Sequence, residues 1–520
     1  MSILTQIAGW PLLAALALVV VPRNYRVVIR AIAVLATFIS TVLAVKMFVG
    51  YGCAVPDAEG FRFVQQIPWV ESLGISYHVG VDGLNVGLVL MGAIVAFAAA
   101  LCSWEIKTRE KEFYILLLVM SGGILGAFAS LDLFFFYFLH ELALVPTFIM
   151  IGVWGRGERK NYATFQITLY LSIGALIALL GLIALYVQSG ANTFDIPKLV
   201  EHLKSNPLET NAQNFIFPLL LFGFGILVSL WPFHSWAPLG YGVAPSPTAM
   251  LHAGVLKKFG LYGLIRVALP LLPEAAQTWA NVIAWLCVGN ILYVGWVAMR
   301  QKDLNLLIGN SSVAHMGFIF LGIASLNLIG ITGAVLIMVA HGFLAALTFA
   351  LNGYIYQQTG TLKMSELGGL CRKLPFIGTA LLMAAMAGCG LPGFANFVGE
   401  ATVFFGAWTV FPTVTVIALW GALVIGGVYM TRAIRNALHG PLPEKWSALV
   451  DASSAWRKLP YALLLLCLLV FGFVPKLLTE KINPDAGKIV TVVAAAAPAE
   501  HALVQVDVPT ARAQSSEIEQ

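Results

Sequence analysis

Residues 230–260 read LWPFHSWAPLGYGVAPSPTAMLHAGVLKKFG, and this stretch decides the class of fold. It is apolar enough to lie in a membrane, yet it carries histidines, a series of prolines and two adjacent lysines. A proline removes a helix hydrogen bond and clashes with the preceding turn, so Pro232 and Pro238 predict a break in a helix. Broken helices inside a bilayer are tolerated where they line a polar cavity. The stretch therefore predicts a membrane protein with a polar pocket beside an interrupted helix.

The composition of the whole chain supports this class. Of its 520 residues, 59% are hydrophobic and 11% are charged, and its mean hydropathy is +0.86. Only helices and closed barrels satisfy all their backbone polar groups in lipid, and a spanning helix needs about 20 mostly apolar residues. The apolar runs are long and lack the alternation of a barrel strand. We therefore expect an all-α polytopic membrane protein.

The apolar runs predict about 14 transmembrane helices joined by short loops. Their expected ranges are 3–22, 26–49, 82–104, 113–130, 132–154, 163–188, 214–236, 244–270, 277–300, 304–325, 328–356, 374–407, 411–438 and 458–478. No basic segment or convincing cleavage site accompanies the first run, so residues 3–22 are interpreted as a retained helix.

Two of these spans are interrupted, the seventh by WPFHSWAP and the twelfth by GCGLPGF. They lie five spans apart, which predicts two five-helix repeats, spans 4–8 and 9–13, inverted relative to each other. The expected parts of the chain are 1–110 with the first three helices, 111–272 with the first repeat, 273–440 with the second repeat, 441–479 with the last helix and its preceding loop, and 480–520 as a flexible tail. Matching interruptions in two halves are typical of transport proteins.

The placement of Lys and Arg predicts the orientation. Nineteen of them lie in the loops of one side and three in the loops of the other. The more basic side faces the cytoplasm by the positive-inside rule. Both termini are therefore expected on the outer side of the membrane.

Two other patterns carry no chemistry. The six cysteines show no CxxC or other ligand spacing, so they are interpreted as buried packing residues rather than iron–sulfur ligands. GCGLPG at 388–393 fits GxGxxG literally, but no strand precedes it and a proline occupies the turn. Neither a bound dinucleotide nor nucleic-acid binding is expected.

The ionisable residues inside the spans are the candidate site. A charge at the bilayer centre costs roughly 2.5–3.5 kcal/mol on insertion scales, so such residues are rare and mark function by default. The candidates are Glu141, Lys257, Lys258, Glu400, His140, His234, His252, His315 and His341. Each one alone is more often a hydrogen-bonded packing residue or a salt-bridge partner. Several in one bundle predict a path for protons, since an imidazole accepts and donates through its two nitrogens.

Several strings in these spans resemble one family. PFHSW, AGVLKKFGLYGLIR, SSVAHMGFIFLGI, AHGFLAALTF and LPGFANFVGE are similar to motifs of the proton-pumping, antiporter-like membrane subunits of respiratory complex I, the NADH-quinone oxidoreductases, and of chain M in particular. The resemblance covers about residues 80–440. It implies a proton relay from Glu141 through Lys258, His315 and His341 to Glu400, and a glutamate at that last position is similar to chain M.

The sequence departs from the family pattern at one position of the relay. The resemblance implies a lysine seven residues before His234, but that residue is Leu227. Two interpretations remain open. Either Lys257 or His252 supplies the missing positive group and pumping continues along a rearranged path, or the chain is a divergent, non-pumping structural paralogue.

The resemblance also implies the setting of the chain. It implies that this chain is a subunit of an enzyme and holds no redox cofactor itself. FMN, iron–sulfur clusters and quinone are then expected in partner subunits. The implied partners are chain L-like and chain N-like antiporter subunits, small membrane subunits and a peripheral redox arm in a bacterial cytoplasmic membrane. An Mrp-type cation/proton antiporter or a membrane-bound hydrogenase shares this fold and remains the alternative.

Overall fold

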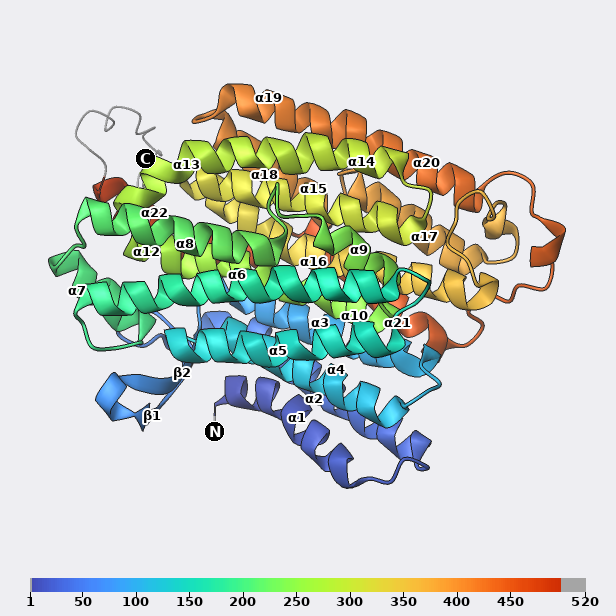
Figure 1. Cartoon of the computed structure of the whole chain (residues 1–520), viewed down its shortest axis with the longest axis horizontal. Coiled ribbons are helices and arrows are strands. Elements are labelled where there is room, and N and C mark those ends of the chain that lie inside the picture. The colour runs from blue at the N-terminus through green and yellow to red at the C-terminus, as the bar shows by residue number, and fades with distance from the viewer. Residues whose placement is uncertain (1, 497–520) are drawn as a thin grey trace, which may run out of the picture.

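The computed structural model describes residues 2–496 and shows a bundle in which most long helices run along the longest axis of the molecule (Figure 1). Within the described residues, 12 helices are long and apolar enough to cross a membrane. They correspond to all the expected spans except 244–270 and 374–407, which consist of shorter helices. The helical membrane fold is confirmed, whereas the count of 14 spans and the inverted repeats stay predictions.

The helices of the first half are α1 (Ile3–Val20), α2 (Arg26–Gly50), α3 (Val86–Cys102), α4 (Glu110–Ala129), α5 (Leu133–Trp154), α6 (Lys160–Ser189), α7 (Ile196–Ser205), α8 (Thr210–Val228), α9 (Trp236–Val243), α10 (Ser246–Leu251), α11 (Lys258–Gly263) and α12 (Leu269–Leu271). The π-helical segments η4 (His252–Leu256) and η5 (Leu264–Ala268) connect the last three into one continuous run.

The helices of the second half are α13 (Pro273–Val288), α14 (Val294–Arg300), α15 (Leu304–Ala324), α16 (Leu328–Thr359), α17 (Pro375–Gly388), α18 (Ala395–Trp408), α19 (Pro412–Trp420), α20 (Gly427–Leu438), α21 (Ala455–Phe473) and α22 (Lys476–Ala495). Two further π-helical segments, η6 (Gly289–Tyr293) and η8 (Gly421–Gly426), interrupt the helices that follow α13 and α19.

Three helices form the centre of the bundle. The most apolar parts of α3, α15 and α16 are almost completely buried, whereas α1, α2 and α6 expose most of theirs. In a membrane, the exposed apolar faces contact lipid or partner chains. The candidate residues on α15 and α16 therefore lie in the most enclosed part of the protein.

The first expected break is confirmed between α8 and α9. The chain leaves the helix at Ser229, whose φ is +73°, and resumes it at Trp236. Asn290 from η6 binds the freed backbone: its Oδ1 accepts from the N–H of Trp231 at 2.7 Å, and its Nδ2 donates to the carbonyls of Ser229 and Val313 at 3.0 Å each. Backbone polar groups that the break frees are thus hydrogen-bonded within the protein, as an interrupted membrane helix requires.

The second expected break is confirmed between α17 and α18. It contains Gly390 with φ +69° and Gly393 with φ +99°, conformations that side chains other than glycine rarely adopt. The turn between these glycines redirects the chain before α18 begins at Ala395. Glu400 consequently lies in the second turn of a new helix that starts inside the bundle.

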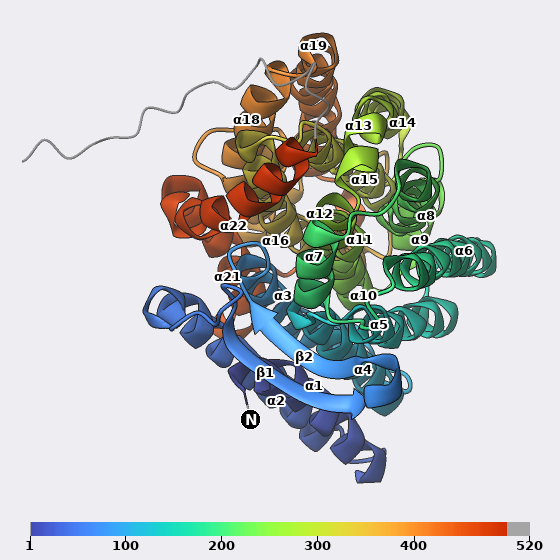
Figure 2. The same cartoon turned by 90° about the vertical axis from the view of Figure 1, so that its left-hand side faces the viewer.

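A β-hairpin corrects the expectation of a purely helical chain. Strands β1 (Arg62–Val70) and β2 (Ile75–Val81) pair antiparallel, and Gly74 closes the turn with φ +67°. Figure 2 shows the hairpin at the same end of the bundle as α7 and α22. The long apolar runs gave no signal for this hairpin, because its strands are short and lie between two spans.

The C-terminal expectation is partly wrong. Residues 480–495 belong to α22, which packs against α12, α13 and α16 rather than forming a mobile tail. Leu478, Ile482, Ala486, Ile489 and Val493 are its buried apolar residues, and they recur at helical spacing. The remainder of the expected tail, 497–520, lies outside the described residues.

Candidate functional site

Four ionisable side chains form a line through the centre of the bundle, from α11 to α18. The Nζ of Lys258 lies 2.8 Å from Nδ1 of His341, and the ring centroids of His341 and His315 are 5.4 Å apart. The Nε2 of His315 lies 3.5 Å from Oε1 of Glu400. Lys258 is 0% exposed and Glu400 is 6% exposed. We call these four residues the Lys258–Glu400 line.

The hydrogen-bond partners indicate which nitrogen of each neutral histidine carries the hydrogen when Lys258 is charged. The Lys258 ammonium donates to the carbonyl of Ala253 at 2.6 Å and to Nδ1 of His341, so neutral His341 carries its hydrogen on Nε2. The Nδ1 of His315 lies 2.8 Å from the carbonyl of Ser311, which only accepts. Neutral His315 therefore holds its hydrogen on Nδ1, and its Nε2 lies 3.5 Å from Oε1 of Glu400.

The helix that carries the lysines is irregular on both sides of Lys258. Segments η4 and η5 flank α11, and the N–H of Lys257 donates to the carbonyl of His252 five residues earlier, at 3.0 Å. Single π turns inside α-helices are frequent at functional sites. Here the Lys258 head group binds the carbonyl of Ala253, which lies inside the irregular segment.

The adjacent Lys257 has different partners. Its Nζ lies 3.5 Å from Oγ of Ser312 on α15 and 5.7 Å from the centre of the Tyr241 ring. Neighbouring residues on a helix point about 100° apart, so the two lysines reach different helices. Only Lys258 joins the line toward Glu400.

His252 and His234 lie near the first break but outside the line. The Nδ1 of His252 lies 3.0 Å from the hydroxyl of Tyr241, and its Nε2 has no hydrogen-bond partner among residues 2–496. His234 is half-buried, with its ring 5.7 Å from that of Tyr293. Within the described part of the chain, neither histidine forms a hydrogen bond, ion pair or ring contact with a residue of the Lys258–Glu400 line.

Glu141 is not enclosed, contrary to the expectation of full burial. Its side chain is 31% exposed because it belongs to the stripe of α5 that faces outward together with Phe138, Val145 and Ile149. Its Oε1 lies 3.4 Å from Nδ1 of His140. Within this chain, Glu141 therefore stands beside the line rather than in it.

His140 connects Glu141 with the helix of the two lysines. Its ring stacks on Phe259, the residue that follows Lys258, with 3.8 Å between ring centroids. In the described part of the chain, His140 is the one positively ionisable group within 4 Å of Glu141. Neither Lys257 nor His252 forms an ion pair with this carboxylate in the described part of the chain.

Sequence reasoning missed three hydroxyl groups of the site. Ser311 and Ser312 precede His315 by four and three residues, and this helical spacing is a signal that they share its face. Tyr429 is distant in the chain and carried no such signal, yet its hydroxyl lies 3.1 Å from Oγ of Ser311. All three are almost completely buried.

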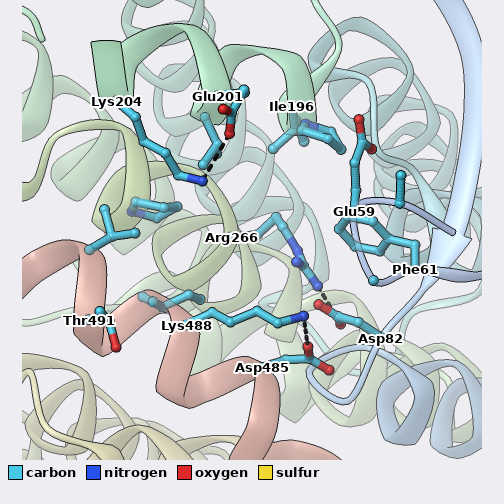
Figure 3. A pocket seen from close by; sticks show the side chains of 17 residues that line it. Glu59, Phe61, Asp82, Ile196, Glu201, Lys204, Arg266, Asp485, Lys488 and Thr491 are labelled. Carbon is cyan, nitrogen blue, oxygen red and sulfur yellow. Dashed lines mark hydrogen bonds and ion pairs between the residues drawn. The ribbon is translucent and has the colours of Figure 1, made fainter. Parts of the chain in front are cut away.

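A separate cavity of about 750 Å³ opens at the end of the bundle that carries α7 and α22 (Figure 3). Six of its charged side chains form ion pairs, Arg266 with Asp82, Lys488 with Asp485, and Lys204 with Glu201, whereas Glu59 forms no ion pair within the described residues. The walls of this cavity include none of the four residues of the Lys258–Glu400 line. This cavity is distinct from the buried line.

Comparison with known proteins identifies the family. Residues 130–426 match the family described as NADH:quinone oxidoreductase/Mrp antiporter, transmembrane. Subunit M of the NADH-quinone oxidoreductase of Rickettsia bellii is 31% identical over 85% of this chain and 88% of that protein. Chain 4 1 of the NAD(P)H-quinone oxidoreductase of Synechococcus elongatus is 35% identical over 92% of this chain and 89% of that protein.

Solved structures agree with the sequence matches. A chain of respiratory complex I from Thermus thermophilus with bound NADH superposes with a TM-score of 0.85 at 27% identity, covering 94% of this chain and 99% of that one. A chain of the Mrp complex from Dietzia sp. has a TM-score of 0.82 at 19% identity, covering 94% and 98%, and shares the fold. The chain therefore belongs to the family of transmembrane subunits of NADH:quinone oxidoreductases and Mrp antiporters, with oxidoreductase subunit M and chain 4 among its relatives.

Proposed function

We propose that this chain is a membrane-arm subunit of a proton-translocating NADH:quinone oxidoreductase. The observation that carries the proposal is the Lys258–Glu400 line. Four ionisable groups in one enclosed row are costly to bury, and proton transfer is a function that uses all of them. The names of the relatives, which are subunits of NADH- and NAD(P)H-quinone oxidoreductases, support the choice of complex.

The geometry suggests the order of transfer. A proton leaves the Lys258 ammonium for Nδ1 of His341, the acceptor it already binds. Release of the hydrogen on Nε2 of His341 passes a proton toward His315, and His315 delivers one from Nε2 to Glu400. His341 takes up a proton on Nδ1 and releases one from Nε2, whereas His315, whose Nδ1 already holds a hydrogen, takes up and releases the proton at Nε2, so each imidazole is neutral again after the transfer.

Electrostatic coupling links this line to the rest of the complex. Charges interact far more strongly in a low-dielectric interior than in water. A change of charge or hydration at Glu141, transmitted by the adjacent His140, therefore alters the protonation of Lys258 without direct contact. Because residue 227 is a leucine, Glu141 lacks the lysine that the family has near it. His140, which contacts Glu141, is proposed to supply the positive charge instead. Lys257 and His252 would act on Glu141 from a greater distance.

Partner chains complete the assembly in this proposal. A carboxylate on an otherwise apolar exposed stripe is costly in lipid, so the stripe of Glu141 is proposed to face another membrane subunit. The expected partners are chain L-like and chain N-like subunits, small membrane subunits and a peripheral redox arm. Those partners would hold FMN, the iron–sulfur clusters and the quinone, in a bacterial cytoplasmic membrane with both termini of this chain outside.

The test uses the assembled complex purified from its native membrane. Mass spectrometry identifies the co-purifying chains, and proteoliposomes report NADH:quinone turnover and proton uptake together. We expect flavin and iron–sulfur subunits, and we expect Glu400→Gln to lower the number of protons moved per NADH. Glu158→Gln is the matched control, because Glu158 is an exposed loop carboxylate.

Two results would contradict the proposal. Sodium-dependent proton movement by an assembly without any NADH-oxidising subunit would assign the chain to an antiporter. An unchanged proton-to-NADH ratio in Glu400→Gln would favour a non-pumping structural subunit, the alternative that Leu227 raises.

A further inference from the structure

A small cavity lies beside the last transfer step. Its volume is about 10 Å³, which is roughly the space that one water molecule needs. The polar side chains that line it are His315, Glu400 and Tyr429, and the backbone of Gly388 also borders it. Segment η8 provides the other wall, where Gly421, Ala422 and Gly426 have little or no side chain to fill the space.

Glu400 has an unpartnered oxygen at this cavity. Its Oε1 is buried and has no hydrogen-bond partner among the described residues. Leaving a buried charged or polar oxygen without a partner costs about 1–3 kcal/mol or more. The 3.5 Å between this oxygen and Nε2 of His315 is too long for a strong direct hydrogen bond. A polar cavity next to an unsatisfied acceptor is the environment that a buried water occupies.

Tyr429 is held in place at the third wall. It is almost completely buried, and its hydroxyl lies 3.1 Å from Oγ of Ser311. The same Oγ lies 3.4 Å from Nδ1 of His315. A phenol can donate one hydrogen bond while it accepts another, so Tyr429 can bind Ser311 and a water at the same time.

We propose that one water molecule in this cavity bridges His315 and Glu400, and that Tyr429 positions it. The inference rests on the proposed function, because it describes the last step of the proton line. Protonated His315 gives the hydrogen on Nε2 to the water, and the water gives one of its own hydrogens to ionised Glu400. The products are neutral imidazole, a protonated carboxyl group and an unchanged water molecule.

Two adjacent glycines allow a matched test. A methyl group added at Gly426 would lie 3.7 Å from the carbonyl oxygen of Gly421 and 3.9 Å from the Tyr429 hydroxyl, so Gly426→Ala fits without a clash. Because Gly426 lines the cavity, we expect this methyl group to take up the space of the water. A methyl group at Gly427 would have no atom within 4 Å, so Gly427→Ala is the control on the same helix. Both glycines have helical backbone angles.

The experiment measures coupled NADH:quinone turnover of the complex in proteoliposomes. We expect Gly426→Ala to be roughly tenfold slower, equivalent to about 1.4 kcal/mol of activation free energy. Gly427→Ala is expected to match the unmodified complex. Infrared difference spectra supply a second readout: the carbonyl band of protonated Glu400, identified by its loss in Glu400→Gln, should move to higher frequency in Gly426→Ala and in Tyr429→Phe as its hydrogen bond is lost.

The outcomes separate this inference from the proposed function. If Gly426→Ala and Gly427→Ala turn over alike and the Glu400 band stays in place, the bridging water is overturned while pumping through Glu400 stands. If Gly426→Ala does not assemble, the position of the band in Tyr429→Phe decides instead. If Glu400→Gln itself pumps normally, the proposed function fails first.

Discussion

Lys258 and His341 make the shortest contact along the buried line, with 2.8 Å between Nζ and Nδ1. This contact joins two halves of the chain, because α11 belongs to the first expected repeat and α16 to the second. The lysine has no carboxylate within ion-pair distance among the described residues. Its positive charge is therefore held by a neutral imidazole and a backbone carbonyl, partners that do not bind it as firmly as an acid would.

Two replacements of His341 should show separately its role in proton transfer and its role in stability. His341→Gln retains an amide oxygen that accepts from Lys258, whereas His341→Leu leaves the ammonium without that acceptor. We expect both variants to lose proton pumping. Only His341→Leu should also lower the melting temperature, since an unsatisfied buried donor costs about 1–3 kcal/mol. Normal pumping by His341→Gln would remove His341 from the path.

The second break should control the position of Glu400. A methyl group at Gly390 would lie 2.6 Å from Oε2 of Glu400, and the φ of +69° disfavours any side chain there. We expect Gly390→Ala to displace the carboxylate and lower the number of protons moved per NADH, measured in proteoliposomes.

A double variant shows whether Gly390 acts through Glu400. Residues in contact are coupled, so their effects do not add. Gly390→Ala combined with Glu400→Gln should pump no worse than Glu400→Gln alone. A further additive loss would indicate that the glycine acts on a different part of the protein.

The buried ion pair at the α7–α22 cavity should stabilise the fold rather than move protons. Arg266 and Asp82 are both almost completely buried, so Asp82→Asn leaves an uncompensated buried charge at a cost of about 3–5 kcal/mol. Thermal unfolding of the purified complex should shift accordingly. Lys204→Ala, which removes an exposed pair worth about 0–1 kcal/mol, should leave the melting temperature almost unchanged. Equal shifts in the two variants would contradict this assignment.

The membrane helices and their interruptions were predictable because their signals are local. Long apolar runs locate the spans, and proline or glycine within a run predicts the break, as at Pro232 and Gly390. The hairpin at 62–81 and the helix at 476–495 were missed, since both lie outside the long apolar runs and depend on packing against other parts of the chain. The amphipathic spacing from Leu478 to Val493 was the available signal for the helix.

The ionisable residues of the site were predictable, but their arrangement was not. The cost of burying charge singled out Lys258, His315, His341 and Glu400, and the structure brings these four together. The exposure of the Glu141 side chain could not be predicted from its apolar neighbours, because the sequence does not show which face of α5 other helices cover. Tyr429 reaches the site only through tertiary packing, which residue spacing cannot show.

The most direct test of the account compares the two adjacent lysines. Lys258 binds His341 within the line, whereas Lys257, equally buried, binds Ser312 outside it. Protons moved per NADH oxidised should be measured for Lys258→Met and Lys257→Met in the same reconstituted complex. We expect Lys258→Met to remove the contribution of this subunit and Lys257→Met to retain most of it. An unchanged ratio in Lys258→Met, or a larger loss in Lys257→Met, would contradict a proton path through the Lys258–Glu400 line.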